Sequence, residues 1–323
     1  MSLFNQKHLQ DEDAAYEWVE AKLWPRGAQC PHCFEKKRVS KMKGKATRRG
    51  LYKCYSCRKQ FRVTVNTIFE KSKVPMHLWL QAFYLIAGSK KGISANQLHR
   101  TLGVTLKTAW FMGHRIREAM RHGTLAPPLG GKGKVVESDE TIFGRADTHP
   151  KGRKRHLPKP LKGSEHKNVI LSLVERGGGV RSFHVSGSTI GQIMPILQKN
   201  VDRESSVMTD SAPHYKRLND GKAFASHDLV DHSSGEYSRH DKDGKVVTTN
   251  TVEGYFSVFK RGMKGTYQHC KEKHLHRYLA EFDFRYNNRS ALKVSDEERA
   301  VEMLKGVKCR RLTYRTPDPS RSL

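Results

Sequence analysis

Four cysteines in two closely spaced pairs constrain the fold of this chain more than any other feature. The pairs are Cys30 with Cys33 in the string CPHC and Cys54 with Cys57 in the string CYSC, and 20 residues separate them. Two pairs at this spacing are typical of a zinc ribbon, in which four thiolates form a tetrahedral structural site around Zn2+. Disulfide bonds and a redox CxxC pair are the alternatives. Disulfides fit poorly with a chain that shows no secretion signal, and a redox pair would not need the second pair.

The chain is strongly basic. Its 323 residues include 60 Lys and Arg against 32 Asp and Glu, a formal net charge of +28, and 36% of them are hydrophobic, which suffices for at least one core. Residues 21–73 alone hold 16 Lys and Arg against two glutamates. A surplus of this size predicts a polyanionic partner. We find no apolar run of membrane-spanning length and no amphipathic helix with a broad apolar face. We therefore expect a cytoplasmic, nucleoid-associated protein that binds nucleic acid and no membrane.

Residues 74–120 are helical by the spacing of their apolar side chains. A short helix at 94–102, a turn at Gly103 and a longer helix that starts at Thr105 or Leu106 form a helix-turn-helix pattern. Many helical bundles also contain a glycine turn, but the neighbouring basic ribbon favours a DNA-binding interpretation. The side chains that the second helix is expected to present to a DNA groove are Lys107, Thr108 and Arg115.

A linker rich in Pro and Gly separates these modules from a region of alternating strands and helices. The pattern predicts strands at 134–143, 168–175, 180–186, 206–209 and 224–230, and helices at 189–200, 213–218, 248–265 and 272–288. This order is that of a ribonuclease-H-like fold. We predict an α/β protein, with a ribonuclease-H-like catalytic domain preceded by a zinc ribbon and a helix-turn-helix domain. The expected parts are an N-terminal helix and zinc ribbon at 1–66, the helix-turn-helix at 67–123, the linker at 124–133, the catalytic domain at 134–290 and a C-terminal tail at 291–323.

Three acidic residues converge in this predicted fold. Asp139 lies inside the first strand, where aspartate is a poor strand former, and Asp210 follows the apolar end of the fourth. If these strands are neighbours, the two side chains meet, and the helix that carries Glu253 can cover them. Clustered carboxylates repel one another unless protons or cations neutralise them, and hard oxygen ligands select Mg2+ or Mn2+. Glu137 shares the strand face of Asp139 and is a candidate supporting ligand. Taken separately, Asp139 could be a solvated edge residue and Asp210 a helix cap.

The helix expected at 248–265 has an apolar and a polar face. Its apolar stripe is Val252, Phe256, Phe259 and Met263, and its polar stripe is Glu253, Ser257, Lys260 and Lys264, with Asn250 and Arg261 at the margin. Glu253 is the one acid among the cations of the polar face. Asn250 followed by Glu253 also has the form of a capping box, with Asn250 as the N-cap. A metal-binding function and a capping function therefore both stay open for these two residues.

Four strings carry a resemblance to a known family: ESDET at 137–141, TDSA at 209–212, NTVEGYFSVFKRG at 250–262 and HLHRYLAEFDFRYNNR at 274–289. They resemble the ISXO-like group of bacterial insertion-sequence transposases, of the DDE superfamily, and the resemblance extends to the zinc ribbon. It implies a ribonuclease-H-like domain, two-metal strand cleavage and transfer at element ends, and a multimeric complex on DNA. In that pattern Asp139 and Asp210 match the first two acids, and Lys260 matches the lysine after the third position. The group's signature has either asparagine or glutamate at the third position, so Asn250 and Glu253 both match.

We predict a DNA transposase that binds the terminal inverted repeats of an insertion sequence and transfers its ends to target DNA, acting as a homo-oligomer on DNA. Water would attack the phosphodiester at the element end, and the released 3′ hydroxyl would then attack the target, without a covalent enzyme intermediate. The expected DNA contacts in this domain are Lys260, Arg261 and Lys264. One alternative is a non-catalytic DNA-binding regulator derived from a transposase, which leaves the three converging acids without a function. A ribonuclease acting on hybrids is another, and it would not need two DNA-reading modules.

Overall fold

The computed structural model describes residues 5–44, 46–121, 126–144, 146, 167–220, 223–241 and 244–313. The chain divides into two compact units, Met1–Arg121 with Ser290–Leu323, and His122–Arg289. Both contain helices and strands, so the predicted α/β class is confirmed. Parts of the predicted linker and of the predicted C-terminal tail lie outside the described residues. No helix in the described part of the chain is long and apolar enough to cross a membrane.

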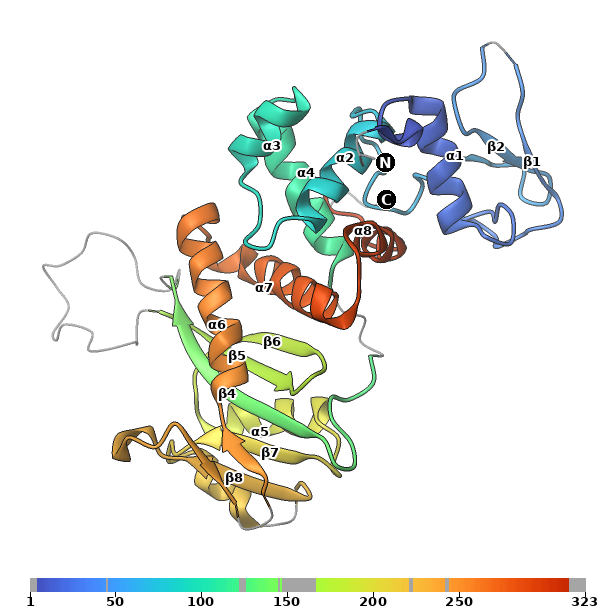
Figure 1. The fold of residues 1–323 in the computed structure, drawn as a ribbon. Helices are drawn as coiled ribbons and strands as arrows, with labels where there is room; N and C mark the ends of the chain where they lie inside the picture. The colour runs from blue at the N-terminus through green and yellow to red at the C-terminus, as the bar shows by residue number, and fades with distance from the viewer. Residues whose placement is uncertain are drawn as a thin grey trace, which may run out of the picture. The chain divides into compact units, whose positions relative to one another are not determined.

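The first unit combines helices with a small sheet (Figure 1). Its elements are η2 (Lys7–Leu9), α1 (Glu12–Leu23), β1 (Val39–Lys41), β2 (Tyr52–Cys54), β3 (Gln60–Phe61), α2 (Met76–Ala87), α3 (Ala95–Leu102), α4 (Leu106–Ala119), η6 (Ser290–Leu292) and α8 (Asp296–Lys305). The strands pair antiparallel in the order β1-β2-β3. Helix α8 falls within the range predicted as a tail. Arg299 of α8 donates a 2.7 Å hydrogen bond to the carbonyl of Ala87 at the end of α2, so this distant segment packs into the first unit.

Helix α3 spans the predicted range to within one residue, and α4 begins at the predicted position. The side chain of Ser94 caps α3 by accepting a hydrogen bond from the amide of Gln97, and that of Thr105 caps α4 from the amide of Thr108. Gly103 ends α3 with a φ of +65°, a left-handed conformation that costs a residue with a Cβ about 1 kcal/mol or more. The short helix, the glycine turn and the longer helix are therefore all present.

The second unit contains a mixed sheet and its helices (Figure 1). Its elements are β4 (Val135–Phe143), β5 (Asn168–Glu175), β6 (Val180–Val185), α5 (Ile190–Asn200), β7 (Ser206–Asp210), η3 (Tyr215–Asp220), β8 (Ser226–Val230), η4 (His232–Ser234), β9 (Ser238–His240), β10 (Val246–Thr248), α6 (Asn250–Gly262), η5 (Met263–Tyr267) and α7 (Glu272–Asn287). Five strands form one sheet in the order β6-β5-β4-β7-β8. The pairs among β4, β5 and β6 are antiparallel, whereas β7 joins β4 and β8 joins β7 in parallel.

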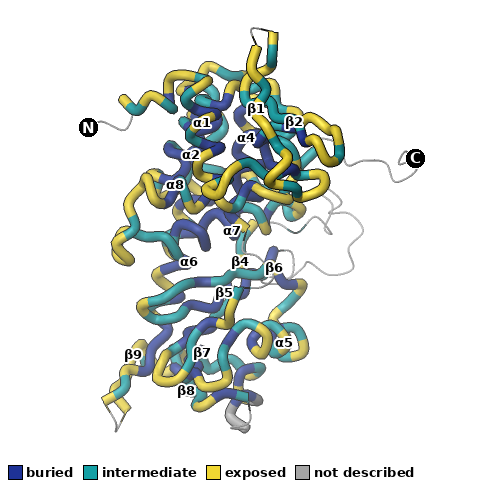
Figure 2. The backbone as a smooth tube through the Cα atoms, turned by 90° about the vertical axis from the view of Figure 1, so that its right-hand side faces the viewer, coloured by how far each residue is buried: buried dark blue, intermediate teal, exposed yellow. Residues whose placement is uncertain are grey.

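Helices cover both faces of this sheet. Along β5, Leu171 and Leu173 belong to the hydrophobic cluster of α5, whereas Ile170 and Val174 belong to the cluster of α6 and α7. Successive residues of a strand point to opposite faces, so α5 packs on one face and α6 with α7 on the other. Figure 2 shows long buried stretches in α6 and α7. The apolar stripe predicted for α6 is accordingly buried.

The predicted strands of the second unit agree with the observed ones to within two residues at each end. The hairpin of β9 and β10 was not predicted, because each of its strands has three residues and is too short for a periodic pattern. This hairpin leads directly into α6 and therefore bears on the position of Glu253.

Candidate functional site

The four predicted zinc ligands form one cluster in the first unit. The sulfur atoms of Cys30, Cys33, Cys54 and Cys57 all lie within 4.8 Å of one another, with 3.7 Å between Cys30 and Cys57 and 3.6 Å between Cys33 and Cys54. A tetrahedral zinc with bonds of about 2.3 Å separates its sulfur ligands by about 3.8 Å. All four are free thiols, so neither pair forms a disulfide. The donor set and its geometry therefore fit structural Zn2+.

A small aromatic cluster supports these cysteines. The rings of Trp24, Tyr52 and Phe61 pack against one another with centroids 5.3 to 5.9 Å apart, and Phe61 is buried beside Cys30 and Cys54. So few apolar side chains make a small core, which is the usual reason for a metal in a module of this size.

In the second unit, the two aspartates predicted to converge lie on neighbouring parallel strands. The register of β4 and β7 pairs Glu137 with Met208, and two further residues along both strands set Asp139 beside Asp210. Burial of Asp139, followed by the charge of Asp210, raises the pKa of Asp139 to about 7. The Asp139 carboxylate accepts a 2.7 Å hydrogen bond from the amide of Glu140, which opposes part of that rise. This end of the sheet therefore concentrates negative charge in a poorly solvated place.

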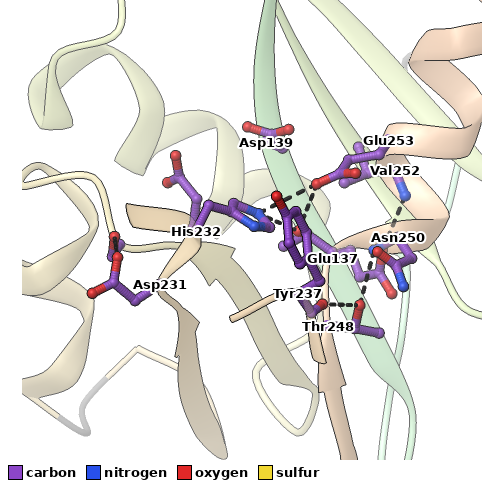
Figure 3. Close-up of polar contacts among 12 residues, drawn as sticks. Glu137, Asp139, Asp231, His232, Tyr237, Thr248, Asn250, Val252 and Glu253 are labelled. Atoms are coloured by element: carbon purple, nitrogen blue, oxygen red, sulfur yellow. Dashed lines mark hydrogen bonds and ion pairs between the residues drawn. The ribbon is translucent and has the colours of Figure 1, made fainter. Parts of the chain in front are cut away.

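Glu253 reaches the same region from the first turn of α6 (Figure 3). Its side chain is 45% exposed, and its charge contributes to the raised pKa of Asp139. Among the described residues, the carboxylate oxygens of Asp139, Asp210 and Glu253 do not lie as close to one another as the four cysteine sulfurs do. The donor set still fits a divalent cation, because hard carboxylate oxygens suit Mg2+ or Mn2+ and a cation would relieve their repulsion.

The prediction that Asn250 caps this helix is wrong. Helix α6 begins at Asn250, so the N-cap position belongs to Thr249, one residue earlier. The backbone N–H of Asn250 donates instead to the hydroxyl of Thr248 at 3.2 Å, and the Asn250 side chain is exposed. Glu253 is four residues from the cap, and its carboxylate accepts a 3.3 Å hydrogen bond from the Thr249 hydroxyl. The predicted capping box is therefore not formed. The contacts of Glu253 with Thr249 and His232 both involve Oε1, so among the described residues its Oε2 is left to a ligand.

The interpretation of Glu137 as a supporting metal ligand is also corrected. Glu137 is fully buried, and its two oxygens accept hydrogen bonds from the amides of Thr251 and Val252, the hydroxyl of Thr251 and the guanidinium of Arg176. Because four donors already occupy this carboxylate, Glu137 fixes the start of α6 and does not act as a metal ligand.

Glu140, which the sequence analysis did not single out, follows Asp139 on β4 and also feels the charge of Asp210. Its carboxylate accepts a 2.6 Å hydrogen bond from the hydroxyl of Tyr215, and the ring of His214 lies 3.4 Å away. Burial first, and then the charge of Asp210, raise the pKa of Glu140 to about 7. Its position beside Asp139 was the one signal in the sequence that could have identified it.

His232 is a second residue that sequence reasoning missed. Its ring nitrogen Nε2 lies 3.3 Å from the Glu253 carboxylate and 3.2 Å from the Thr249 hydroxyl. The exposed ring of Tyr237 packs against it, with centroids 5.6 Å apart. Figure 3 shows His232 and Glu253 facing each other near Asp139. No periodicity or spacing in the sequence links His232 or Tyr237 to the start of α6.

The residues predicted to contact DNA differ in exposure. Arg261, Lys264 and Lys107 are exposed, and Lys260 and Thr108 are partly exposed. Arg115 is buried. Its guanidinium donates to the carbonyls of Ile68, Glu70 and Leu312, and burial lowers its pKa. The prediction that Arg115 faces a DNA groove is therefore wrong, because its position on α4 turns inward.

Comparison with known proteins identifies the class. Residues 10–60 match the family described as "Transposase zinc-ribbon domain", and residues 128–287 match the one described as "ISXO2-like transposase domain". The chain is thus a protein of the insertion-sequence transposase class, with a zinc ribbon ahead of the transposase domain. Within that class it belongs to the ISXO2-like family, as the resemblance predicted.

The comparisons also give one related protein and one solved structure. An "Uncharacterized protein in transposable element ISH50" from Halobacterium salinarum is 28% identical over 272 residues, which cover 81% of this chain and 86% of the relative. A chain in a structure of the simian T-cell lymphotropic virus intasome with PP2A regulatory subunit B56 gamma is 13% identical, with a TM-score of 0.27, over 58% of this chain and 63% of that chain. So low a TM-score has no bearing on the fold.

Proposed function

We propose that this chain is a DNA transposase of the DDE superfamily, which binds the terminal inverted repeats of an insertion sequence and carries out divalent-metal-dependent strand cleavage and transfer. The observation that carries the proposal is that Asp139, in the middle of β4, lies beside Asp210, the last residue of the neighbouring parallel strand β7. Glu253, from α6, adds its charge to theirs. Carboxylates contributed by three separate elements are a ligand set that Mg2+ and Mn2+ prefer in proteins.

A ribonuclease-H-like fold is the architecture that best accounts for the sheet of the second unit. Three antiparallel strands, β4 to β6, come first, and β7 and β8 add in parallel on the open side of β4. Helix α5 makes the crossover between β6 and β7, and α6 and α7 pack on the opposite face. This is the arrangement that the predicted order of strands and helices requires.

In this reading Asp139, Asp210 and Glu253 would hold the divalent ions, with Asn250 as the amide alternative to Glu253. When bound, such ions neutralise charge that builds up on a phosphodiester during an in-line displacement. Before any cation binds, the raised pKa of Asp139 means that the site keeps a proton near neutral pH. A ligand carboxylate must lose that proton, so cation binding and proton release are coupled. The three carboxylates thus favour the binding of a cation over that of an uncharged ligand.

The basic residues would position the DNA. Lys260 lies seven residues after Glu253 on α6 and would contact a phosphate near the acids, while Arg261 and Lys264 continue the basic surface. In the first unit, the zinc ribbon and a helix-turn-helix formed by α3 and α4 would select the terminal repeat, with Lys107 at the exposed start of α4. Strand transfer of two element ends would require a homo-oligomer on the DNA.

A non-catalytic DNA-binding regulator remains the rival function. It would need the zinc ribbon and the basic surfaces but no converging acids. Asp139 and Glu140 both have a pKa raised to about 7, and burying carboxylates together destabilises a fold. Perturbed carboxylates of this kind cluster at functional sites, which favours the enzyme.

A strand-cleavage assay on duplex DNA that carries the element's terminal repeats tests the proposal. With Mg2+, the unmodified protein should nick at the repeat ends, and Asp139→Asn should bind the repeat but not cleave it. Asp202→Asn, which changes an aspartate in the turn before β7, serves as the control and should cleave normally. An RNA–DNA hybrid substrate separates a transposase from a ribonuclease. Cleavage by Asp139→Asn at the unmodified rate would reject the site.

A further inference from the structure

Glu137 and Arg176 form a buried polar network in the transposase unit. Glu137 is 0% exposed, and its Oε2 accepts from the amides of Thr251 at 2.8 Å and Val252 at 2.9 Å. Its Oε1 accepts from the Thr251 hydroxyl at 2.8 Å and from Nε of Arg176 at 2.6 Å. A carboxylate at a helix N-terminus satisfies amides that have no partner inside the helix and interacts favourably with the helix dipole. We call this arrangement the Glu137 clamp.

Arg176 extends the clamp to the chain that enters α6. Its guanidinium donates 2.6 Å and 2.8 Å hydrogen bonds to the carbonyls of Val246 and Thr248, at the two ends of strand β10. The Arg176 amide also donates to the carbonyl of Val135 at the start of β4. The ion pair therefore fixes three segments to one another: β4, β10 and the first turn of α6.

The residues of the clamp are close in sequence to two of the proposed catalytic acids, Asp139 and Glu253. Glu137 precedes Asp139 by two residues and shares its strand face, whereas Thr251 and Val252 directly precede Glu253. Glu253 itself is 45% exposed, and its carboxylate lies 3.3 Å from the Thr249 hydroxyl and 3.3 Å from the ring of His232. Contacts of that length do not fix a carboxylate strongly. Its position relative to Asp139 must come mainly from the backbone of α6.

We propose that Glu137 is a positioning residue, which, with Arg176 as its partner, sets the helix of the third acid against the strand of the first. This inference rests on the proposed metal-dependent function. Groups that hold metal ligands without touching the metal typically change metal affinity or activity about 10- to 100-fold when they are altered. The clamp accounts for a fully buried charge in the sheet that has no direct part in the chemistry.

The test measures Mn2+ binding to the zinc-loaded full chain by electron paramagnetic resonance, alongside hydrogen exchange of the peptide that covers the start of α6. Glu137→Gln replaces one accepting oxygen with an amide donor, so we expect faster exchange at Thr251 and Val252 and a dissociation constant for Mn2+ raised about 10-fold or more. Glu175→Gln is the matched control. Glu175 lies on the neighbouring strand and accepts from the Gly130 amide at 2.9 Å and from Lys134 at 2.7 Å, away from α6.

A second variant, Thr251→Val, separates positioning from direct ligation and also covers a failure of Glu137→Gln to fold. It removes one donor to Glu137 and leaves the carboxylate in place. A positioning function predicts a smaller but measurable loss of Mn2+ affinity in Thr251→Val. Unchanged affinity in Thr251→Val, despite faster exchange in α6, would overturn the inference, as would equal losses in Glu137→Gln and Glu175→Gln.

The proposed metal site is tested separately by Asp139→Asn. If the unmodified chain and Asp139→Asn bind Mn2+ equally, the metal site itself is rejected, and the clamp is only a structural tie. If Asp139→Asn loses Mn2+ while Glu137→Gln and Thr251→Val retain it, the metal site stands and the positioning function of Glu137 fails.

Discussion

Asp139, in the middle of β4, lies beside Asp210, the last residue of the parallel strand β7, and the charge of Asp210 adds to burial in raising the pKa of Asp139 to about 7. An unfolded chain would titrate this carboxyl near its ordinary value of 3.8. Between about pH 4 and pH 7, the folded protein therefore keeps a proton on Asp139 that the unfolded chain has already lost.

The first prediction follows from that difference. Because the folded state binds more protons, stability should fall as pH rises from about 4 to about 7 and then level off. Asp139→Asn removes this cost, so it should stabilise the protein at pH 8 by up to about 4 kcal/mol without added Mg2+. Urea denaturation at pH 5.5 and pH 8 measures the effect. An Asp139→Asn protein no more stable than the unmodified chain at pH 8 would contradict it.

The second prediction concerns the third ligand. Glu253→Gln should reduce cleavage about 100-fold or more, because groups that only support metal ligands typically cost up to about 100-fold. Stability should change little, because the Glu253 side chain is 45% exposed. Asn250→Asp keeps an oxygen ligand and should stay active. An active Glu253→Gln protein beside an inactive but folded Asn250→Ser protein would instead assign the ligand to Asn250.

The third prediction concerns zinc. Cys30→Ser should lose the metal and unfold the ribbon, because structural zinc contributes about 10 to 16 kcal/mol to such modules. Metal analysis and binding to the terminal repeat check this. Cys309→Ser, which alters an exposed thiol outside the cluster, should keep its zinc. Purified protein without zinc would require another function for the four cysteines.

The fourth prediction contrasts two basic residues of α4. Lys107 is exposed, so Lys107→Ala should weaken DNA binding and reduce the slope of log affinity against log salt by about 1. Arg115 donates to three backbone carbonyls, so Arg115→Ala should lower stability, by about 2 to 4 kcal/mol, and leave the salt slope of the folded protein unchanged. A salt slope reduced by Arg115→Ala would contradict its burial.

The sequence by itself determined the zinc cluster and the positions of most helices and strands. The cysteine spacing suffices because each CxxC pair is a local turn, and one metal can then join the two. The caps at Ser94 and Thr105 and the turn at Gly103 are likewise local, since they depend on residues no more than a few positions away. The apolar stripe of α6 is a periodic signal of the same kind.

The tertiary structure decided which polar residues face the site and which hold the fold. Asp139 and Asp210 are 71 positions apart in the chain, and the pairing of β4 with β7 brings them together. Glu137 has a carboxylate on the same strand face as Asp139, as a metal ligand could have. Its oxygens instead accept hydrogen bonds from the first amides of α6. In the sequence Arg115 resembles a DNA contact, but in the fold its guanidinium donates to the carbonyls of Ile68 and Leu312, which come from distant segments. Partners that come from distant segments leave no local pattern, because sequence periodicity records only which side of an element is buried and not what lies against it.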